Sequence, residues 1–102
     1  MNTDAFTVLA EPTRRRILDE LRHSQRSVGD LVAALDIAQP NVSKHLKVLS
    51  AAGFVSCRID AQRRIYSIET AQLKIIDAWL EPYRRLWGKH LSALERHLDT
   101  KE

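Results

Sequence analysis

The sequence predicts a mainly helical domain with one small β-hairpin. Two observations lead to this prediction: apolar residues recur every three or four positions over most of the chain, and the spacing changes to two between residues 54 and 69. The length supports it as well, because 102 residues are enough for one domain around one hydrophobic core. We therefore expect residues 1–102 to form a single domain.

Two helices are expected at the N-terminal end. The first spans residues 3–10, where Thr3 can cap the helix start. The second spans residues 12–24, and Pro12 suits its first turn because an N–H at that position would have no intrahelical partner. Three consecutive arginines at positions 14–16 leave two interpretations open: a solvated basic face, or contacts to phosphate groups.

Two further helices follow closely on one another. Residues 27–35 form a short helix with Ser27 as its N-cap, and an acidic residue three positions later makes a variant of the capping box. Residues 39–52 form the next helix, which starts near Pro40 and ends at Gly53, a residue suited to the left-handed conformation that terminates helices. Only a few residues connect these two helices.

A β-hairpin and a long helix complete the chain. The hairpin covers residues 54–69, where two β-rich runs, FVSCRI and RIYSIE, are joined by a tight DAQR turn. The last helix spans residues 70–98, and Pro82 is expected to kink it or divide it in two. Apolar residues follow each other along this helix at a spacing of three or four: Leu73, Ile76, Leu80, Tyr83, Trp87, Leu91, Leu94 and Leu98.

The two short, closely coupled helices match a helix-turn-helix, in which the second helix lies in the DNA major groove, and the hairpin after them makes a winged version. On the helix at residues 39–52, Val42, Leu46 and Leu49 fall on one side, whereas the polar and cationic residues fall on the other side or at the N-terminal end. Such side chains can bond to base edges and neutralise phosphate. The candidate DNA-binding residues are Gln39, Asn41, Ser43, Lys44, His45 and Lys47 on this helix, with Arg63 and Arg64 at the hairpin tip.

The charge distribution agrees with a polyanionic partner. The whole chain carries a net charge of +3, whereas residues 39–66 alone hold five basic residues and one acidic residue, a net charge of +4. The same segment also suits a winged-helix module that binds an acidic protein, and this alternative stays open. An enzyme is the least expected class, because the sequence offers no Ser/His/Asp set, no paired carboxylates, no phosphate loop and no metal triad.

Four segments, LAEPTRRRILDEL, VGDLVAAL, QPNVSKHLKVLSAAGFV and RRIYSI, together resemble the winged helix-turn-helix repressors of the ArsR/SmtB type. The resemblance covers nearly the whole chain. It implies a homodimeric repressor of bacterial transcription whose fourth helix enters the major groove and whose wing touches the flanking DNA backbone. It also implies that the terminal helices form the dimer.

The metal sites of similar proteins are incomplete in this chain. The third helix, which begins SVGDLV, lacks the cysteine pair that metal-sensing members carry there. On the last helix Asp77 and His90 stand at two ligand positions of other members, but Trp79 and Ala93 replace the remaining two ligands. Two of four ligands would not hold a metal tightly, so we expect neither a metal nor another cofactor.

Three residues have no role that the sequence can assign: Cys57, His90 and His97. A single cysteine excludes an intramolecular disulfide and fits a reducing compartment. The N-terminal segment lacks the pattern of a signal peptide, and no run approaches the roughly 20 apolar residues of a membrane span. We therefore expect a cytoplasmic protein with double-stranded DNA and a second copy of itself as partners, and no membrane.

Apolar side chains on the last helix are expected to form the dimer interface. A domain of this size cannot easily cover both faces of so long a helix, and each aromatic side chain buries on the order of 150–250 Å² when it is covered. Packing against a two-fold related copy would cover them, while part of the stripe belongs to the intrachain core. The expected interface residues are Trp79, Tyr83, Leu86, Trp87, Leu91 and Leu94.

Overall fold

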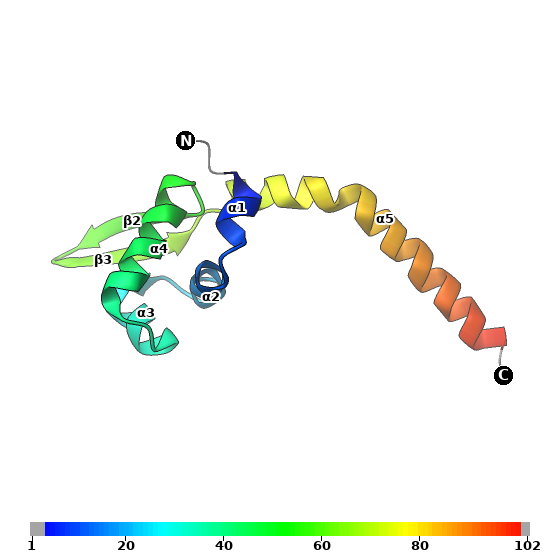
Figure 1. The fold of residues 1–102 in the computed structure, drawn as a ribbon, viewed down its shortest axis with the longest axis horizontal. Helices are drawn as coiled ribbons and strands as arrows, with labels where there is room; N and C mark the ends of the chain where they lie inside the picture. The colour runs from blue at the N-terminus through cyan, green and yellow to red at the C-terminus, as the bar shows by residue number, and fades with distance from the viewer. Residues whose placement is uncertain (1–3, 101–102) are drawn as a thin grey trace.

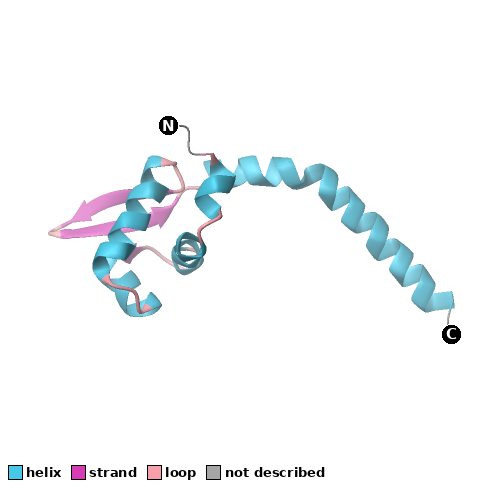
Figure 2. Ribbon diagram, in the orientation of Figure 1, coloured by secondary structure: helices cyan, strands magenta, loops and turns pink. Residues whose placement is uncertain are grey.

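A computed structural model describes the backbone of residues 4–100 and the side chains of residues 4–90. The elements in chain order are α1 (Ala5–Leu9), α2 (Pro12–Leu21), β1 (Arg26–Ser27), α3 (Val28–Leu35), α4 (Gln39–Ala51), β2 (Val55–Asp60), β3 (Arg63–Ile68) and α5 (Ala71–Thr100). Helices α1 to α4 and the hairpin gather into one body, from which most of α5 projects (Figures 1 and 2). The expected mainly helical fold with a hairpin is confirmed.

Carboxylates cap the starts of the first two helices. Asp4 accepts a hydrogen bond from the N–H of Thr7 at 2.8 Å, and Glu11 accepts one from the N–H of Thr13 at 3.1 Å. The cap of α1 is therefore Asp4, and the assignment of that role to Thr3, which lies outside the described residues, was wrong. Both carboxylates satisfy backbone donors that have no intrahelical acceptor.

Local signals also define α3 and the end of α4. The Ser27 hydroxyl accepts from the N–H of Asp30 at 3.1 Å, and the Asp30 carboxylate accepts from the N–H of Ser27 at 3.0 Å, which completes the expected capping box. Gly53 has a φ of 83°, and there the N–H of Phe54 donates to the carbonyl of Leu49 at 2.9 Å. This arrangement terminates α4 where the sequence predicts.

The three consecutive arginines of α2 bind the last carbonyl groups of neighbouring helices. Such carbonyls have no donor within their own helix, and a guanidinium can supply one. Two arginines donate to carbonyls of α1 and the third donates to a carbonyl of α3. Neither interpretation from the sequence, a solvated basic face or phosphate contacts, included this structural role. The pairs are Arg14 with Val8 (2.7 Å), Arg15 with Leu9 (2.5 Å) and Arg16 with Leu35 (3.0 Å).

Three strands form an antiparallel sheet in the order β1–β3–β2. The hairpin turn consists of Ala61 and Gln62 alone, because the residues on either side already pair as strands; Ala61 has a φ of 57°. Strand β1 was not expected, and its Arg26 pairs with Tyr66 of β3. The second helix therefore ends at Leu21 rather than at residue 24, since the chain must leave the helix to reach the sheet.

The hydrophobic core lies between α1 to α4 and the inner end of the hairpin, and its burial follows the helical periodicity. Each fully buried side chain of this kind contributes about 1.5–3 kcal/mol relative to an exposed one. Seven residues have no exposed surface: Val8, Ile17, Leu31, Val42, Leu46, Leu49 and Phe54.

Helix α5 continues through Pro82 from Ala71 to Thr100. Of the two outcomes expected at this proline, division into two helices is excluded, and Figure 1 shows one continuous helix that changes direction along its length. Proline removes an N–H donor and its ring crowds the carbonyl of Ala78, four residues earlier, which bends a helix without ending it.

Candidate nucleic-acid interface

Helix α4 turns one side toward the core and the other toward solvent. Val42, Leu46 and Leu49 have no exposed surface, and α4 packs against α2, α3 and β2. Five polar or cationic candidates on α4 are exposed: Gln39, Asn41, Ser43, Lys44 and Lys47. Because the buried side is fixed by packing, the exposed side has a defined direction, as expected for the second helix of a helix-turn-helix.

A cavity of about 570 Å³ separates α4 from the hairpin, and we call it the α4–hairpin cavity. The α4 wall consists of Gln39, Ser43, Lys47 and Ser50, while the other wall holds Val28, Cys57, Arg64 and Tyr66. Three of the α4 candidates and one hairpin arginine thus share a single cavity. Its lining contains two cations and no carboxylate, which suits an anionic group such as a phosphate.

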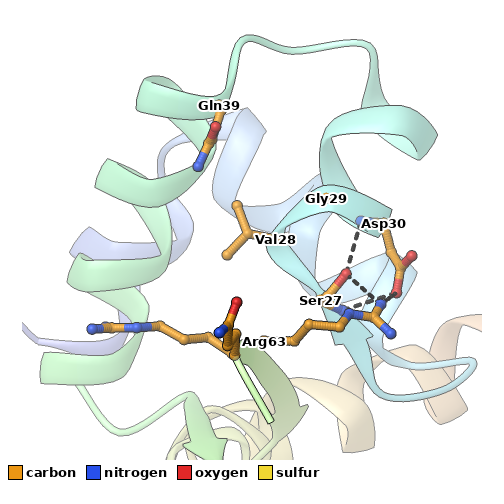
Figure 3. A pocket seen from close by; sticks show the side chains of 8 residues that line it. Ser27, Val28, Gly29, Asp30, Gln39 and Arg63 are labelled. Carbon is orange, nitrogen blue, oxygen red and sulfur yellow. Dashed lines mark hydrogen bonds and ion pairs between the residues drawn. The ribbon is translucent and has the colours of Figure 1, made fainter. Parts of the chain in front are cut away.

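The other hairpin arginine, Arg63, points to α3. Its Nη2 lies 3.0 Å from the Ser27 hydroxyl and 3.4 Å from a carboxylate oxygen of Asp30. Figure 3 shows this side chain reaching Ser27 and Asp30. These residues line a cavity of about 510 Å³, to which Val28 of α3 and Gln39 of α4 also contribute. Both candidate arginines line this cavity: Arg63 is tied to α3, whereas Arg64 also lines the α4–hairpin cavity.

The charge state of Asp30 maintains this tie. Hydrogen bonding to the backbone and then to the side chain of Ser27 lowers the pKa of the Asp30 carboxyl, and the positive charges of Arg63 and Arg26 lower it further. The group is thus ionised at neutral pH. A fixed negative charge beside Arg63 partly offsets the positive potential of the hairpin tip.

His45 is placed differently from the other α4 candidates. It is half-buried, and its Nδ1 is buried without a hydrogen-bond partner among the residues whose side chains are described. It lies close enough to α2 that its charge adds to the lowering of the Glu11 pKa, which the N–H of Thr13 mainly causes. His45 therefore offers less free surface to DNA than Ser43 does.

Several residues of these cavities were missed by the sequence reasoning. Ser50 is one, although it follows Ser43 by seven residues and Lys47 by three, the spacing of one helix face. The pairing of Arg63 with Ser27 and Asp30 had no such signal, because the partners are separated by 36 and 33 residues in the chain.

An exposed apolar surface lies on α5 and α1, and we call it the α5 patch. It consists of Phe6, Ile75, Trp79, Tyr83, Leu86 and Trp87, with exposed fractions between 43% and 56%. Phe6 meets Trp79 edge-on with ring centroids 5.2 Å apart, and Trp79 lies 4.7 Å from Tyr83. Phe6 and Ile75 were not among the expected interface residues. The side chains of two that were, Leu91 and Leu94, lie outside the described part.

The described residues contain no group of three or more His, Cys, Asp and Glu side chains that could hold a metal ion. Asp77 instead accepts a hydrogen bond from Arg84 at 2.7 Å. His90 and Cys57 are exposed, and the side chain of His97 is outside the described range. Within the described residues, no helix has both the length and the apolar character needed to cross a membrane.

Known proteins share both sequence and fold with this chain. Residues 11–56 match the family described as "Bacterial regulatory protein, arsR family". The HTH-type transcriptional regulator Rv2034 of Mycobacterium tuberculosis is 34% identical over 95% of this chain and 88% of its own. The transcriptional repressor SdpR of Bacillus subtilis is 32% identical over 76% of this chain and 86% of its own.

Solved structures agree with these sequence matches. The crystal structure of a possible transcriptional regulator for arsenical resistance superimposes with a TM-score of 0.73 at 31% identity, covering 86% of this chain and 97% of the other. An ArsR-like transcriptional regulator from Rhodococcus sp. RHA1 gives a TM-score of 0.71 at 28% identity, covering 95% and 89%. With its winged helix-turn-helix fold, the chain therefore belongs to the ArsR family of bacterial transcriptional regulators, which bind DNA and are not enzymes.

Proposed function

We propose that this chain acts in the cytoplasm as a single-domain repressor that binds a pseudo-palindromic operator as a homodimer and blocks the promoter it overlaps. The observation that carries the proposal is the exposed polar face of α4, which lies beside Arg64 across the α4–hairpin cavity. The names of relatives such as the transcriptional repressor SdpR support repression over activation.

The two kinds of side chain on this face have different roles in the proposal. Amide, hydroxyl and imidazole groups can bond to base edges in the major groove and so select the sequence. Cationic side chains neutralise phosphates and supply the salt-dependent part of the affinity. Gln39, Asn41, Ser43 and His45 take the first role, and Lys44, Lys47, Arg63 and Arg64 take the second.

The α5 patch supports the homodimer. Large apolar side chains gathered on one surface are unfavourable in water, and a two-fold related copy covers a self-complementary patch. We assign Trp79, Tyr83, Leu86, Trp87, Leu91 and Leu94 to this interface. The two copies of α4 would then lie about 34 Å apart and enter successive major grooves on one side of the DNA.

The operator can be obtained by selecting bound sequences from a random oligonucleotide pool. We expect two inverted half-sites whose centres lie roughly 10–10.5 base pairs apart. If the polar face instead binds an acidic protein, no sequence will be enriched. This result would contradict the DNA-reading role of α4.

A double substitution tests the residues of α4 directly. Ser43→Ala with Lys44→Ala removes one candidate base contact and one candidate phosphate contact, so operator affinity should fall on the order of tenfold in a gel shift. Lys89→Ala is a matched control, because it removes an exposed lysine from α5. Unchanged operator affinity in the double variant would contradict the assignment of Ser43 and Lys44 as DNA contacts.

A further inference from the structure

A cavity of about 320 Å³ lies away from the exposed face of α4, and we call it the α2 cavity. Four apolar side chains form its floor: Leu9 of α1, Leu18 of α2, Ile68 of β3 and Leu73 of α5. Its volume is at the small end of the range, about 300–1,000 Å³, that small-molecule sites occupy. An apolar floor of this kind suits a hydrocarbon or aryl group.

Charged residues of α2 and its C-cap, Arg22, complete the lining. Arg15, Asp19 and Arg22 follow each other at helical spacing, so two guanidinium groups and one carboxylate border the apolar floor. Arg15 uses Nη1 to bind the Leu9 carbonyl and keeps other N–H groups. Among the described residues Arg22 has no ion-pair partner. The excess of cations favours an anionic head group over a cationic one.

We propose that the α2 cavity binds a small amphipathic carboxylate and that this ligand regulates operator binding. The apolar chain lies on the leucine and isoleucine floor, and the carboxylate pairs with Arg22 and with the remaining donors of Arg15. Planar guanidinium groups match a carboxylate with two parallel hydrogen bonds, which gives such a site its preference for that head group. The regulatory half of this inference rests on the proposed function.

The position of the cavity couples it to both working surfaces of the protein. Ile68 is the last residue of β3, whose first residue is Arg63 at the hairpin tip, and Leu73 is in the first turn of α5, which carries the α5 patch. Leu9 ends α1, which contributes Phe6 to the same patch. A ligand between these residues changes how β3 packs against α2 and how α1 packs against α5. It therefore favours one orientation of the two α4 helices over another.

Binding is tested first on the DNA-free protein by isothermal titration with three probes of equal chain length: decanoate, decan-1-ol and decylamine, each below its aggregation limit. We expect saturable binding of decanoate that is at least tenfold tighter than that of the alcohol or the amine. Arg22→Glu should weaken decanoate binding at least tenfold. Lys74→Glu makes the same charge change on an exposed residue next to Leu73 and should alter binding less than twofold.

The regulatory step is then measured as operator affinity with and without saturating decanoate, and we expect a change of at least threefold that Arg22→Glu removes. The inference would be overturned if decanoate shows no saturable binding, for example because a second subunit fills the cavity. Equal binding of the three probes, equal losses in the two charge variants, or ligand binding that leaves operator affinity unchanged would overturn it as well. A protein that binds no DNA even without ligand contradicts the proposed function instead, so the two failures are distinguishable.

Discussion

Arg63 at the hairpin tip lies 3.4 Å from the carboxylate of Asp30 and 3.0 Å from the hydroxyl of Ser27, so the wing is tied to the start of α3. Ser27 and Asp30 also hold each other in the capping box of that helix. The Asp30 carboxylate thus caps the start of α3 and also pairs with Arg63 of the hairpin. A DNA phosphate near the wing would compete with Asp30 for the same guanidinium group.

Replacing Asp30 with Asn should strengthen binding to DNA of any sequence. Asn keeps an oxygen that can accept the Ser27 N–H, but it loses the charge that holds Arg63. Exposed ion pairs are weak because water screens them, so the expected gain in affinity is modest, up to about fivefold. Fluorescence anisotropy over a salt series should also show a slope of log K against log salt that steepens by about one.

Two further variants separate the release of Arg63 from a general charge effect. Asp60→Asn removes an equal charge from the hairpin, where Asp60 lies 3.8 Å from Arg58. Arg63→Ala combined with Asp30→Asn removes the group that would be released, so the gain should disappear in that double variant. Equal gains from Asp60→Asn and Asp30→Asn would show that only net charge matters.

Acid should destabilise the fold through its capping carboxylates. The pKa values of Asp4, Glu11 and Asp30 are lowered, mainly by hydrogen bonds to the backbone of Thr7, Thr13 and Ser27 respectively. A pKa that is lower in the folded state gives stability that is present above the unfolded value, about 3.9–4.3, and is lost as the pH falls through the folded value. The midpoint temperature of thermal unfolding should therefore decrease as the pH falls below about 4.

The share of Asp30 in this acid loss can be isolated. Circular dichroism melts of Asp30→Asn and the parent chain should differ at pH 6, and the difference should narrow as the pH falls below about 4, because the parent chain then progressively loses its charged cap. Asp19→Asn is the control, since no hydrogen bond to its carboxylate is described. A gap between Asp30→Asn and the parent that persists unchanged at pH 3 would refute the electrostatic explanation.

The parts of the fold that follow from neighbouring residues were predictable. The capping box at Ser27, the left-handed end at Gly53 and the buried stripe of α4 each depend on a few adjacent positions. Strand β1 was not predictable, because two residues show no periodicity and pair only with a strand that comes much later. The role of Arg16 was ambiguous for the related reason that it binds a carbonyl 19 residues away.

Arg16→Ala should lower the stability of the domain. The Arg16 guanidinium donates to the carbonyl of Leu35 at 3.0 Å and joins α2 to the end of α3. A hydrogen bond from a charged donor contributes about 1.5–3 kcal/mol, and partial exposure here reduces that to about 1 kcal/mol. Chemical denaturation at fixed protein concentration should show this loss, whereas Arg22→Ala should change the free energy of unfolding by less than half as much. Similar losses in both variants would contradict the role of the Leu35 contact.

The candidate site was predictable to a different degree on α4 and on the hairpin. Helical spacing alone placed Ser43 and Lys47 on one exposed face, and the structure puts both in the α4–hairpin cavity with Arg64. The sequence could not distinguish Arg64 from Arg63, because adjacent strand residues point to opposite faces and the direction of each depends on the pairing of β1 with β3. His45 shows the same limit: its partial burial follows from packing near α2.

Trp79→Glu should convert the proposed dimer into monomers. Trp79 is 51% exposed and contacts two other aromatic rings of the α5 patch, Phe6 edge-on and Tyr83 at a tilt. A carboxylate there would be buried without a partner in the dimer, which costs several kcal/mol at each of two symmetric positions. Sedimentation velocity at micromolar concentration should give half the mass of the parent protein, while circular dichroism shows that the fold is kept.

Ile59→Glu is the matched control for this prediction. Ile59 is 72% exposed on the hairpin, so the change has the same character but lies outside the α5 patch. It should leave the oligomeric state unchanged. Dissociation by both variants would indicate a general loss of solubility or folding rather than a dimer on α5. If the Trp79→Glu protein keeps the mass of the dimer, the interface does not lie on the α5 patch.

Because a monomer holds only one α4, Trp79→Glu should also abolish preference for paired over single half-sites in a gel shift.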